Sequence, residues 1–424
     1  MMPVSLTRTI RRILVGRKQQ FVFVANPDVT LPPLTSIALY IHIPFCKNMC
    51  PYCPYNRVAY EKNLVAPYTE AVLREIEQYS LTLGSVEVPS IYVGGGTPTN
   101  LIDELGLILQ SVRQRFAVVG DICVETSPSD LSREVVGKLK DFGVDLISVG
   151  VQSFGDDSLR ALGRNYDSAG AKTALQLVLS SDFKSVNVDL MFALPGQGIE
   201  DVLSDLRETV EMNLPQVTAY PLFTFPYSSV GRYLRAKNVT MPNMFSRRRM
   251  YKAIYDFYLR NGYQRVSVWG FRKGDVPTYS SVTRDEYIGI GAGACTSLPK
   301  VFYLNTFSVR AYIDTALSGK LPIALSMSFT PQLRKYYWLY WQFYGTRMNK
   351  RDLYEIFPAK SLRLRAVLGV MKFLGLYREN ESTIELTERG SFYVHLLQNY
   401  LLLDYINRVW TIAMTKPWPR KIEI

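Results

Sequence analysis

The stretch that decides the fold is Tyr40–Arg57, YIHIPFCKNMCPYCPYNR. Its apolar start predicts a buried strand, and Cys46, Cys50 and Cys53 follow that strand with the spacing C-x3-C-x2-C. Thiolates suit zinc or iron–sulfur clusters. Structural zinc normally has four ligands, and the nearest other candidate, His42, lies inside the predicted strand. We therefore predict that the three thiolates hold three irons of a [4Fe–4S] cube and leave the fourth iron open.

Around this loop, strand-like and helix-like segments alternate from Ile37 to Tyr220. Short runs rich in Val, Ile and Leu are typical of strands buried on both faces. The predicted strands are Ile37–Ile43, Ser90–Val93, Asp121–Glu125, Leu146–Gln152, Ser185–Phe192 and Gln216–Pro221. The predicted helices are Val65–Tyr79, Leu101–Arg115, Ser132–Phe142, Ser168–Ser180 and Gly198–Met212. This alternation indicates an α/β fold with a parallel sheet, either a partial barrel or a doubly wound sheet.

The whole chain divides into four predicted parts. These are a basic N-terminal extension (1–35), a partial barrel (36–225), a mixed region that completes the barrel (226–325) and a mostly helical, winged-helix-like module (326–424). The extension contains a basic amphipathic segment, Thr7–Gln20, which we interpret as a solvated helix. The last part has predicted helices at Pro331–Tyr344, Lys350–Ile356 and Leu362–Leu374, strands around Leu376 and Ile384, and a final helix from Thr387.

Composition limits the function classes. The 424 residues are 47% hydrophobic and 20% charged, which is typical of a folded globular protein. Arg8, Arg11 and Arg12 interrupt any secretory signal, and no apolar run is long enough to span a membrane, so we expect a cytoplasmic protein. The net charge of +12 favours anionic partners. Lys and Arg are spread along the chain, so we do not expect nucleic-acid binding, and peripheral contact with a membrane surface remains open.

The cysteine loop, its preceding strand and Tyr52 before the third cysteine resemble the radical SAM superfamily. The resemblance implies a partial (β/α)6 barrel and a [4Fe–4S] cluster on Cys46, Cys50 and Cys53. It implies that S-adenosylmethionine binds the open iron. An electron from a donor such as flavodoxin or ferredoxin then cleaves this cofactor to a 5′-deoxyadenosyl radical. That radical would take hydrogen from a small-molecule substrate.

Other motifs of the sequence resemble those of the branch that contains oxygen-independent coproporphyrinogen III oxidase. They are IPFC, GGGTP, GVQSF and DLM–LPGQ. By themselves, the glycines permit close backbone approach or simply form a tight turn. Polar residues at carboxyl ends of strands either meet at a ligand or are satisfied within the protein. The resemblance implies that these residues, together with Tyr52, bind the cofactor: Gly94, Gly95, Gly96, Thr97, Pro98, Glu125, Gln152, Arg164 and Asp189.

The chain also departs from that branch. Tyr55 stands where the oxidases carry an additional cysteine, and Tyr279–Ala294 lacks the histidine of haem-chaperone-like members. His42 and His395 are the only histidines, and we interpret His395 as structural. Three segments of the sequence resemble class C radical SAM methyltransferases: WGF, YSSVTRDEYIGIGAGA and NTFSVRAYI. This implies a second adenosylmethionine near Gly291 and Gly293, although an ordinary turn explains these glycines equally well.

The expected function is therefore methylation of an unsaturated apolar substrate such as a quinone, a tetrapyrrole or another aromatic molecule. The alternatives are oxidation of the coproporphyrinogen oxidase type and haem carriage. Seven aromatic residues crowd nine positions near residue 340, and they suit either an interdomain core or a wall for a planar substrate. They are Tyr336, Tyr337, Trp338, Tyr340, Trp341, Phe343 and Tyr344.

Overall fold

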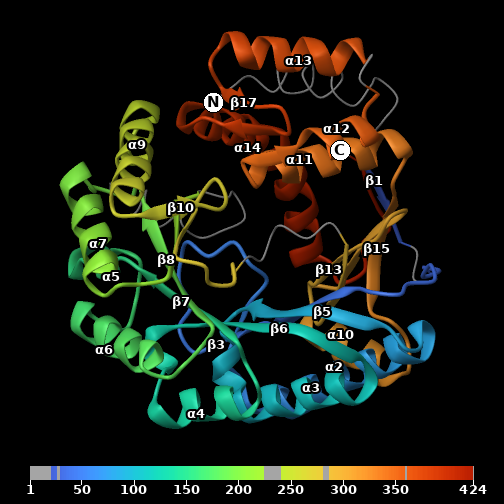
Figure 1. The fold of residues 1–424 in the computed structure, drawn as a ribbon. Helices are drawn as coiled ribbons and strands as arrows, with labels where there is room; N and C mark the ends of the chain where they lie inside the picture. The colour runs from blue at the N-terminus through green and yellow to red at the C-terminus, as the bar shows by residue number, and fades with distance from the viewer. Residues whose placement is uncertain (1–20, 26–28, 224–239, 280–285, 359–360, 424) are drawn as a thin grey trace.

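The structure is a computed structural model that describes residues 21–25, 29–223, 240–279, 286–358 and 361–423 (Figure 1). Six parallel strands form the centre of one sheet, in the order β9-β8-β7-β6-β5-β2. They are β2 (Ala38–Ile43), β5 (Glu87–Gly95), β6 (Ala117–Thr126), β7 (Leu146–Gln152), β8 (Ser185–Phe192) and β9 (Gln216–Pro221). The six predicted strands are confirmed, and β5 and β6 are longer than predicted. The expected segment Thr7–Gln20 lies outside the described residues.

Shorter strands extend the sheet on both sides. Beside β2 follow β12 (Tyr287–Ile290), β13 (Cys295–Ser297), β14 (Val301–Asn305), β15 (Ile323–Ser328), β1 (Val22–Val24) and β19 (Lys421–Glu423). Beside β9 lie β11 (Gly270–Lys273) and β10 (Tyr263–Arg265). Only β12 among these joins the parallel set, because it pairs in parallel with β2. Within the described residues the sheet stays open, with β10 and β19 as its ends. The predicted α/β fold with a parallel sheet is confirmed.

Helices follow the strands and cover the outer side of the sheet (Figure 1). They are α2 (Lys62–Leu83), α3 (Ile102–Arg115), α4 (Arg133–Asp141), α5 (Asp156–Ala161), α6 (Ser168–Leu179), α7 (Ile199–Glu211) and α10 (Val309–Leu317). In α2, Tyr68, Val72, Ile76 and Tyr79 recur every three or four residues and are completely buried against the sheet. This spacing places one apolar stripe on the core. The sequence did not predict the short helix α5.

The C-terminal module has its own small core. It contains α11 (Pro331–Tyr344), β16 (Arg347–Asn349), α12 (Lys350–Ile356), α13 (Leu362–Phe373), β17 (Tyr377–Glu379), β18 (Thr383–Leu386) and α14 (Glu388–Thr415). The strands form a separate sheet in the order β16-β18-β17. In the aromatic run, Tyr336, Trp338 and Phe343 pack in the module core, whereas Tyr344 packs against the main core. No helix in the described part of the chain has the length and apolar character needed to cross a membrane.

A buried carboxylate of α2, Glu75, joins this helix to α10, to β14 and to the turn after β12. Glu75 Oε2 accepts hydrogen bonds from the Gly291 N–H at 2.8 Å and the Tyr312 hydroxyl at 2.5 Å. Its Oε1 accepts one from the side-chain amide of Asn305 at 2.7 Å. Glu75 is completely buried, and desolvation raises its pKa to about 7 despite these three hydrogen bonds. Folding therefore favours the protonated form of Glu75.

This raised pKa predicts a pH-dependent contribution to stability. The contribution is fully present below the unfolded value of 4.5 and is lost as the pH rises through 7. Glu75→Gln stays neutral at every pH. Relative to wild type, its free energy of unfolding should therefore rise by about 3 kcal/mol between pH 4.5 and 7.5. Urea denaturation checks this, with the exposed Glu70→Gln as control. Parallel pH curves for Glu75→Gln and wild type would contradict it.

Candidate functional site

The cysteine loop lies between two short paired strands, β3 (Phe45–Cys46) and β4 (Val58–Ala59), directly after β2. Cys46 and Cys50 are buried and Cys53 is half-buried, and all three are free thiols. The Cys53 N–H donates to the carbonyl of Cys50 at 3.3 Å, which curls the loop. The loop thus gathers three soft ligands at the carboxyl end of a central strand.

The donor set fits the predicted iron–sulfur cluster. In the described part of the chain, no three Cys, His, Asp or Glu side chains meet at the spacing that a single metal ion needs. A cube differs from a single ion because each thiolate binds a separate iron. Burial raises the pKa of Cys46 to about 12 and also raises that of Cys53, while the Arg57 guanidinium opposes both shifts. Metal binding must therefore displace protons from these thiols.

His42 and Asn56 hold the C-terminal end of the cysteine loop in place through hydrogen bonds. The carbonyl of Asn56 accepts a hydrogen bond from His42 Nε2 at 2.7 Å, so His42 Nδ1 is free to accept one from the Tyr40 hydroxyl at 2.7 Å. Burial lowers the pKa of His42 to about 4 and keeps the ring neutral. The Asn56 side chain donates to the carbonyls of Ala292 and Phe307, both at 3.0 Å. His42 thus supports the loop and has no ring nitrogen left for a ligand.

The GGGTP segment ends β5 and packs against the cysteine loop. The Gly96 N–H donates to the Ile43 carbonyl at 2.8 Å, and the Thr97 N–H donates to the Phe45 carbonyl at 2.9 Å. The Thr97 hydroxyl lies 3.9 Å from Cys46 Sγ. Gly95 has a φ of +117°, and a Cβ there would lie 2.7 Å from the His42 ring. Gly95 is therefore required both by its conformation and by lack of space.

Glu125 lies on β6, and its carboxylate is next to the same glycines. Its Oε2 accepts a hydrogen bond from the Gly95 N–H at 3.2 Å, and Tyr92 and Tyr279 direct their hydroxyls at Oε1. A Cβ at Gly94 would meet Glu125 Oε2 at 2.7 Å. Burial raises the pKa of Glu125, and the three hydrogen bonds oppose the shift. The sequence did not predict the tyrosine pair, because Tyr279 lies 154 residues from Glu125.

Gln152 ends β7 in a strained conformation. Its φ of 74° is unusual for a residue with a side chain, and its Oε1 accepts a hydrogen bond from the Tyr220 hydroxyl at 3.0 Å. The turn that follows is held by Asp205, which accepts from the Phe154 N–H at 2.7 Å and from the Ser153 hydroxyl at 2.8 Å. Backbone strain of this kind persists where surrounding structure enforces it, and it is common at functional sites.

Arg164 and Asp189 supply opposite charges next to the loop. The Arg164 guanidinium lies over the rings of Tyr52 and Tyr166, at 5.6 and 5.7 Å, and its buried Nε has no hydrogen-bond partner. Asp189 on β8 accepts a hydrogen bond from Asn187 at 2.9 Å. Burial and the nearby charge of Glu125 raise the pKa of Asp189 to about 7, and Arg164 opposes the shift. This corner can therefore bind a ligand with both cationic and anionic groups.

The structure thus brings the cysteine loop, GGGTP, Glu125, Gln152, Arg164 and Asp189 together along the carboxyl edge of the sheet. Their cofactor roles remain predictions. Gly291 and Gly293 instead pack against His42 and Asn56, the residues that support the loop. A Cβ at Gly291 would lie 2.4 Å from the His42 carbonyl oxygen, and one at Gly293 would lie 2.6 Å from Asn56 Nδ2. Close packing against protein therefore explains both glycines without a second adenosylmethionine.

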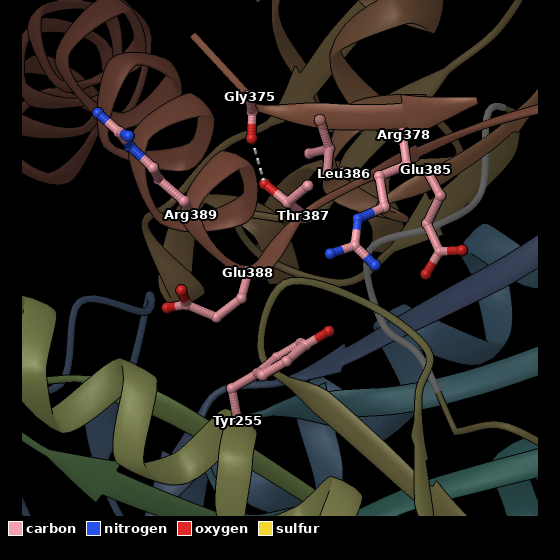
Figure 2. A pocket seen from close by; sticks show the side chains of 8 residues that line it. All are labelled: Tyr255, Gly375, Arg378, Glu385, Leu386, Thr387, Glu388 and Arg389. Atoms are coloured by element: carbon pink, nitrogen blue, oxygen red, sulfur yellow. Dashed lines mark hydrogen bonds between the residues drawn. The ribbon is translucent and has the colours of Figure 1, made fainter. Parts of the chain in front are cut away.

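A separate cavity of about 380 Å³ lies between α9 (Met244–Arg260) and the C-terminal module (Figure 2). Its walls include none of the predicted site residues. Both of its carboxylates already have arginine partners, since Glu388 pairs with Arg248 and Glu385 pairs with Arg265. The cavity is therefore part of the contact between α9 and the module rather than of the candidate site.

Comparisons with known proteins agree with this geometry. A model of the radical SAM superfamily matches residues 40–208. The heme chaperone HemW of Lactococcus lactis is 29% identical over 87% of this chain and 98% of its own length. HemW of Escherichia coli K12 is 32% identical over 63% of this chain and 70% of its own length. Anaerobilin synthase of Escherichia coli O157:H7 is 26% identical over 89% of this chain and 87% of its own length.

Among solved structures, coproporphyrinogen III oxidase (HemN) from Escherichia coli has a TM-score of 0.74. It is 20% identical and the match covers 88% of this chain and 90% of that one, so it supports the fold. The expected closeness to methyltransferases is not supported by these relatives. The sequence of Tyr279–Ala294 suggested that closeness. Its glycines Gly291 and Gly293 instead allow close packing against His42 and Asn56.

The thiolate loop predicts which cysteines the cluster needs. Cys46→Ala, Cys50→Ala and Cys53→Ala should each abolish the anaerobically reconstituted cluster, because each removes the sole protein ligand of one iron. Iron and sulfide content with visible absorption measures this. Cys123→Ala in β6 and Cys295→Ala in β13 are matched controls that should keep the cluster. A complete four-iron cluster in any of the first three variants would refute the assignment.

The carboxylates predict where the cofactor's charges bind. Asp189→Asn and Glu125→Gln should keep the cluster and weaken adenosylmethionine binding by about tenfold or more, because each removes a charged hydrogen-bond acceptor. Equilibrium dialysis on cluster-loaded protein measures the affinity. Asp182→Asn is the control, since Asp182 is exposed and Asn tolerates its φ of 54°. Unchanged affinity in both site variants would exclude these residues from the binding site.

Proposed function

The chain belongs to the radical SAM superfamily, whose cofactors are a [4Fe–4S] cluster and S-adenosylmethionine, and we propose that it applies radical chemistry to a tetrapyrrole. One observation carries the proposal: three free thiols share one edge of the sheet with GGGTP, Glu125 and Asp189. The tetrapyrrole follows from relatives that are named for heme and for anaerobilin and that align over most of this chain.

Bound together, the cluster and adenosylmethionine supply a 5′-deoxyadenosyl radical. The chain's own residues position the cofactor. Backbone groups of Gly94–Gly96 are open to its methionyl part because these positions have no side chains. Asp189 and Glu125 provide negative charge for cationic groups, and Arg164 provides positive charge for a carboxylate. Tyr52 lies under the Arg164 guanidinium and holds it beside the loop.

Tyr55 is an exposed residue of the cysteine loop. It stands two positions after Cys53 and is 60% exposed. A tyrosine phenol in contact with water keeps its proton at neutral pH, so this side chain is neutral. We assign Tyr55 to the side of the site that faces the substrate. It occupies the position at which the resemblance places an additional cysteine in the oxidases.

Haem carriage without chemistry is the second candidate, and the specific observation in its favour is the HemW relative that spans almost the entire chain. Methylation, the function expected from the sequence, is not named for any of the relatives described above. The three outcomes differ in their products. Chemistry on a tetrapyrrole consumes adenosylmethionine, whereas carriage leaves both haem and adenosylmethionine unchanged.

A turnover assay separates these functions. Cluster-loaded, reduced protein is incubated with methyl-deuterated adenosylmethionine and with ferric haem, coproporphyrinogen III or a naphthoquinone. We expect 5′-deoxyadenosine above the substrate-free rate only with a tetrapyrrole, together with a new tetrapyrrole mass. Cys50→Ala is the control and should form neither product, because it lacks the cluster. Mass spectrometry of both products is the measurement.

The remaining results decide among the alternatives. Deuterium in 5′-deoxyadenosine together with S-adenosylhomocysteine would restore methylation. Haem that binds tightly but remains unaltered, with no stimulated cleavage, would establish carriage instead. Neither binding nor turnover with haem or coproporphyrinogen III would reject the tetrapyrrole altogether.

A further inference from the structure

His395 presents a buried, unpartnered nitrogen where the C-terminal module meets the sheet. It lies on α14 and is 5% exposed. Its ring packs perpendicular to Trp269 at 4.9 Å, and it contacts the rings of Tyr344 at 5.6 Å and Phe223 at 6.4 Å. Nε2 has no hydrogen-bond partner. Buried polar atoms are nearly always satisfied, so an exception of this kind calls for an explanation such as a missing ligand.

Gln398 determines which ring nitrogen carries the proton. Its side-chain Nε2 donates to the carbonyl of Tyr340 at 2.8 Å, and this fixes the orientation of the amide. The Gln398 Oε1 therefore faces His395 Nδ1, at 3.3 Å. An amide oxygen can only accept, so Nδ1 bears the hydrogen and Nε2 bears the lone pair. Burial lowers the pKa of His395 to about 4, so the ring is neutral at neutral pH. A neutral imidazole with one oriented lone pair is the form that ligates metals.

The aromatic cage is built on the same edge of the sheet as the candidate site. Trp269 contacts Phe192 at the end of β8, the strand that carries Asp189, with ring centroids 5.8 Å apart. Burial raises the pKa of Tyr344, and the charge of Asp189 adds to the shift, so the two side chains are close. His395 therefore lies in aromatic surroundings, and Trp269 connects it to the end of β8, the strand that carries Asp189.

We propose that His395 Nε2 is the axial ligand to the iron of a bound haem, with Trp269 and Tyr344 packed against the macrocycle. The inference rests on the proposed function, because it assumes a tetrapyrrole at this edge. His42, the other histidine, cannot serve, since Tyr40 and Asn56 occupy both of its nitrogens. The cage covers Nε2 in this structure, so haem binding requires a ring of the cage to turn aside.

Cluster-loaded protein tests this ligation, because its loop thiolates are then unavailable to haem. Ferric haem is titrated, and the ferric complex is examined by pulsed electron paramagnetic resonance in protein labelled with ¹⁵N-histidine. We expect hyperfine coupling from an axial histidine nitrogen in wild type and in Tyr393→Phe, a control on an exposed neighbour. His395→Phe keeps the ring shape and should lose that coupling. Gln398→Leu removes the partner of Nδ1 and should weaken haem binding by about tenfold.

The outcomes separate this inference from the proposed function. Coupling that persists in His395→Phe would overturn His395 as the ligand while the tetrapyrrole stands. Wild type that binds haem without any histidine coupling would do the same. Failure of wild type to bind haem or coproporphyrinogen III would instead reject the proposed function. If His395→Phe does not fold, Gln398→Leu decides, and an unchanged haem affinity in that variant would contradict the proposal.

Discussion

The candidate site depends on the hydrogen bonds that hold the cysteine loop onto the ends of β2 and β5. The loop contains its own ligands, yet its thiols are buried and their burial favours the protonated form. Its shape must therefore come from the protein around it. Gly96 and Thr97 hold the start of the loop through backbone hydrogen bonds, and His42 holds the end through the Asn56 carbonyl. Glycine at 95 is needed because any side chain there would displace His42.

A second constraint is charge. Glu125 and Asp189 are both half-buried, and the charge of Glu125 disfavours ionisation of Asp189. Arg164 is the cation that opposes the shift of Asp189. A ligand that brings ammonium and sulfonium charges would stabilise both carboxylates in their ionised forms. The electrostatics of this corner therefore favour a cationic ligand, in agreement with the cofactor of the superfamily.

The sequence predicted what short-range patterns determine. Apolar runs between turn signals located all six central strands, because strands buried on both faces are continuously apolar. The cysteine spacing and the strand-end residues Glu125, Gln152 and Asp189 followed from the same local order. The tyrosines around Glu125 and the support of the loop by Asn56 join residues far apart in the chain, and no local pattern records such contacts. The short strands β10, β13 and β19 likewise lack the length that makes a pattern visible.

The C-terminal module explains why the substrate could not be predicted from the strands alone. Arg265 of β10 is bonded to Ser391 at 2.6 Å, and Arg248 of α9 is bonded to Glu388, with its Nη2 2.6 Å from Glu388 Oε2. These contacts fix the start of α14 against the barrel side. α11 adds a hydrophobic connection, because Phe343 belongs to the module core and Tyr344 packs against the main core. His395 therefore lies one helix turn after Ser391. Its ring has Trp269 of the barrel on one side and Tyr344 of the module on the other. The surroundings of His395 are thus made from both halves of the chain, and they depend on how the two halves pack.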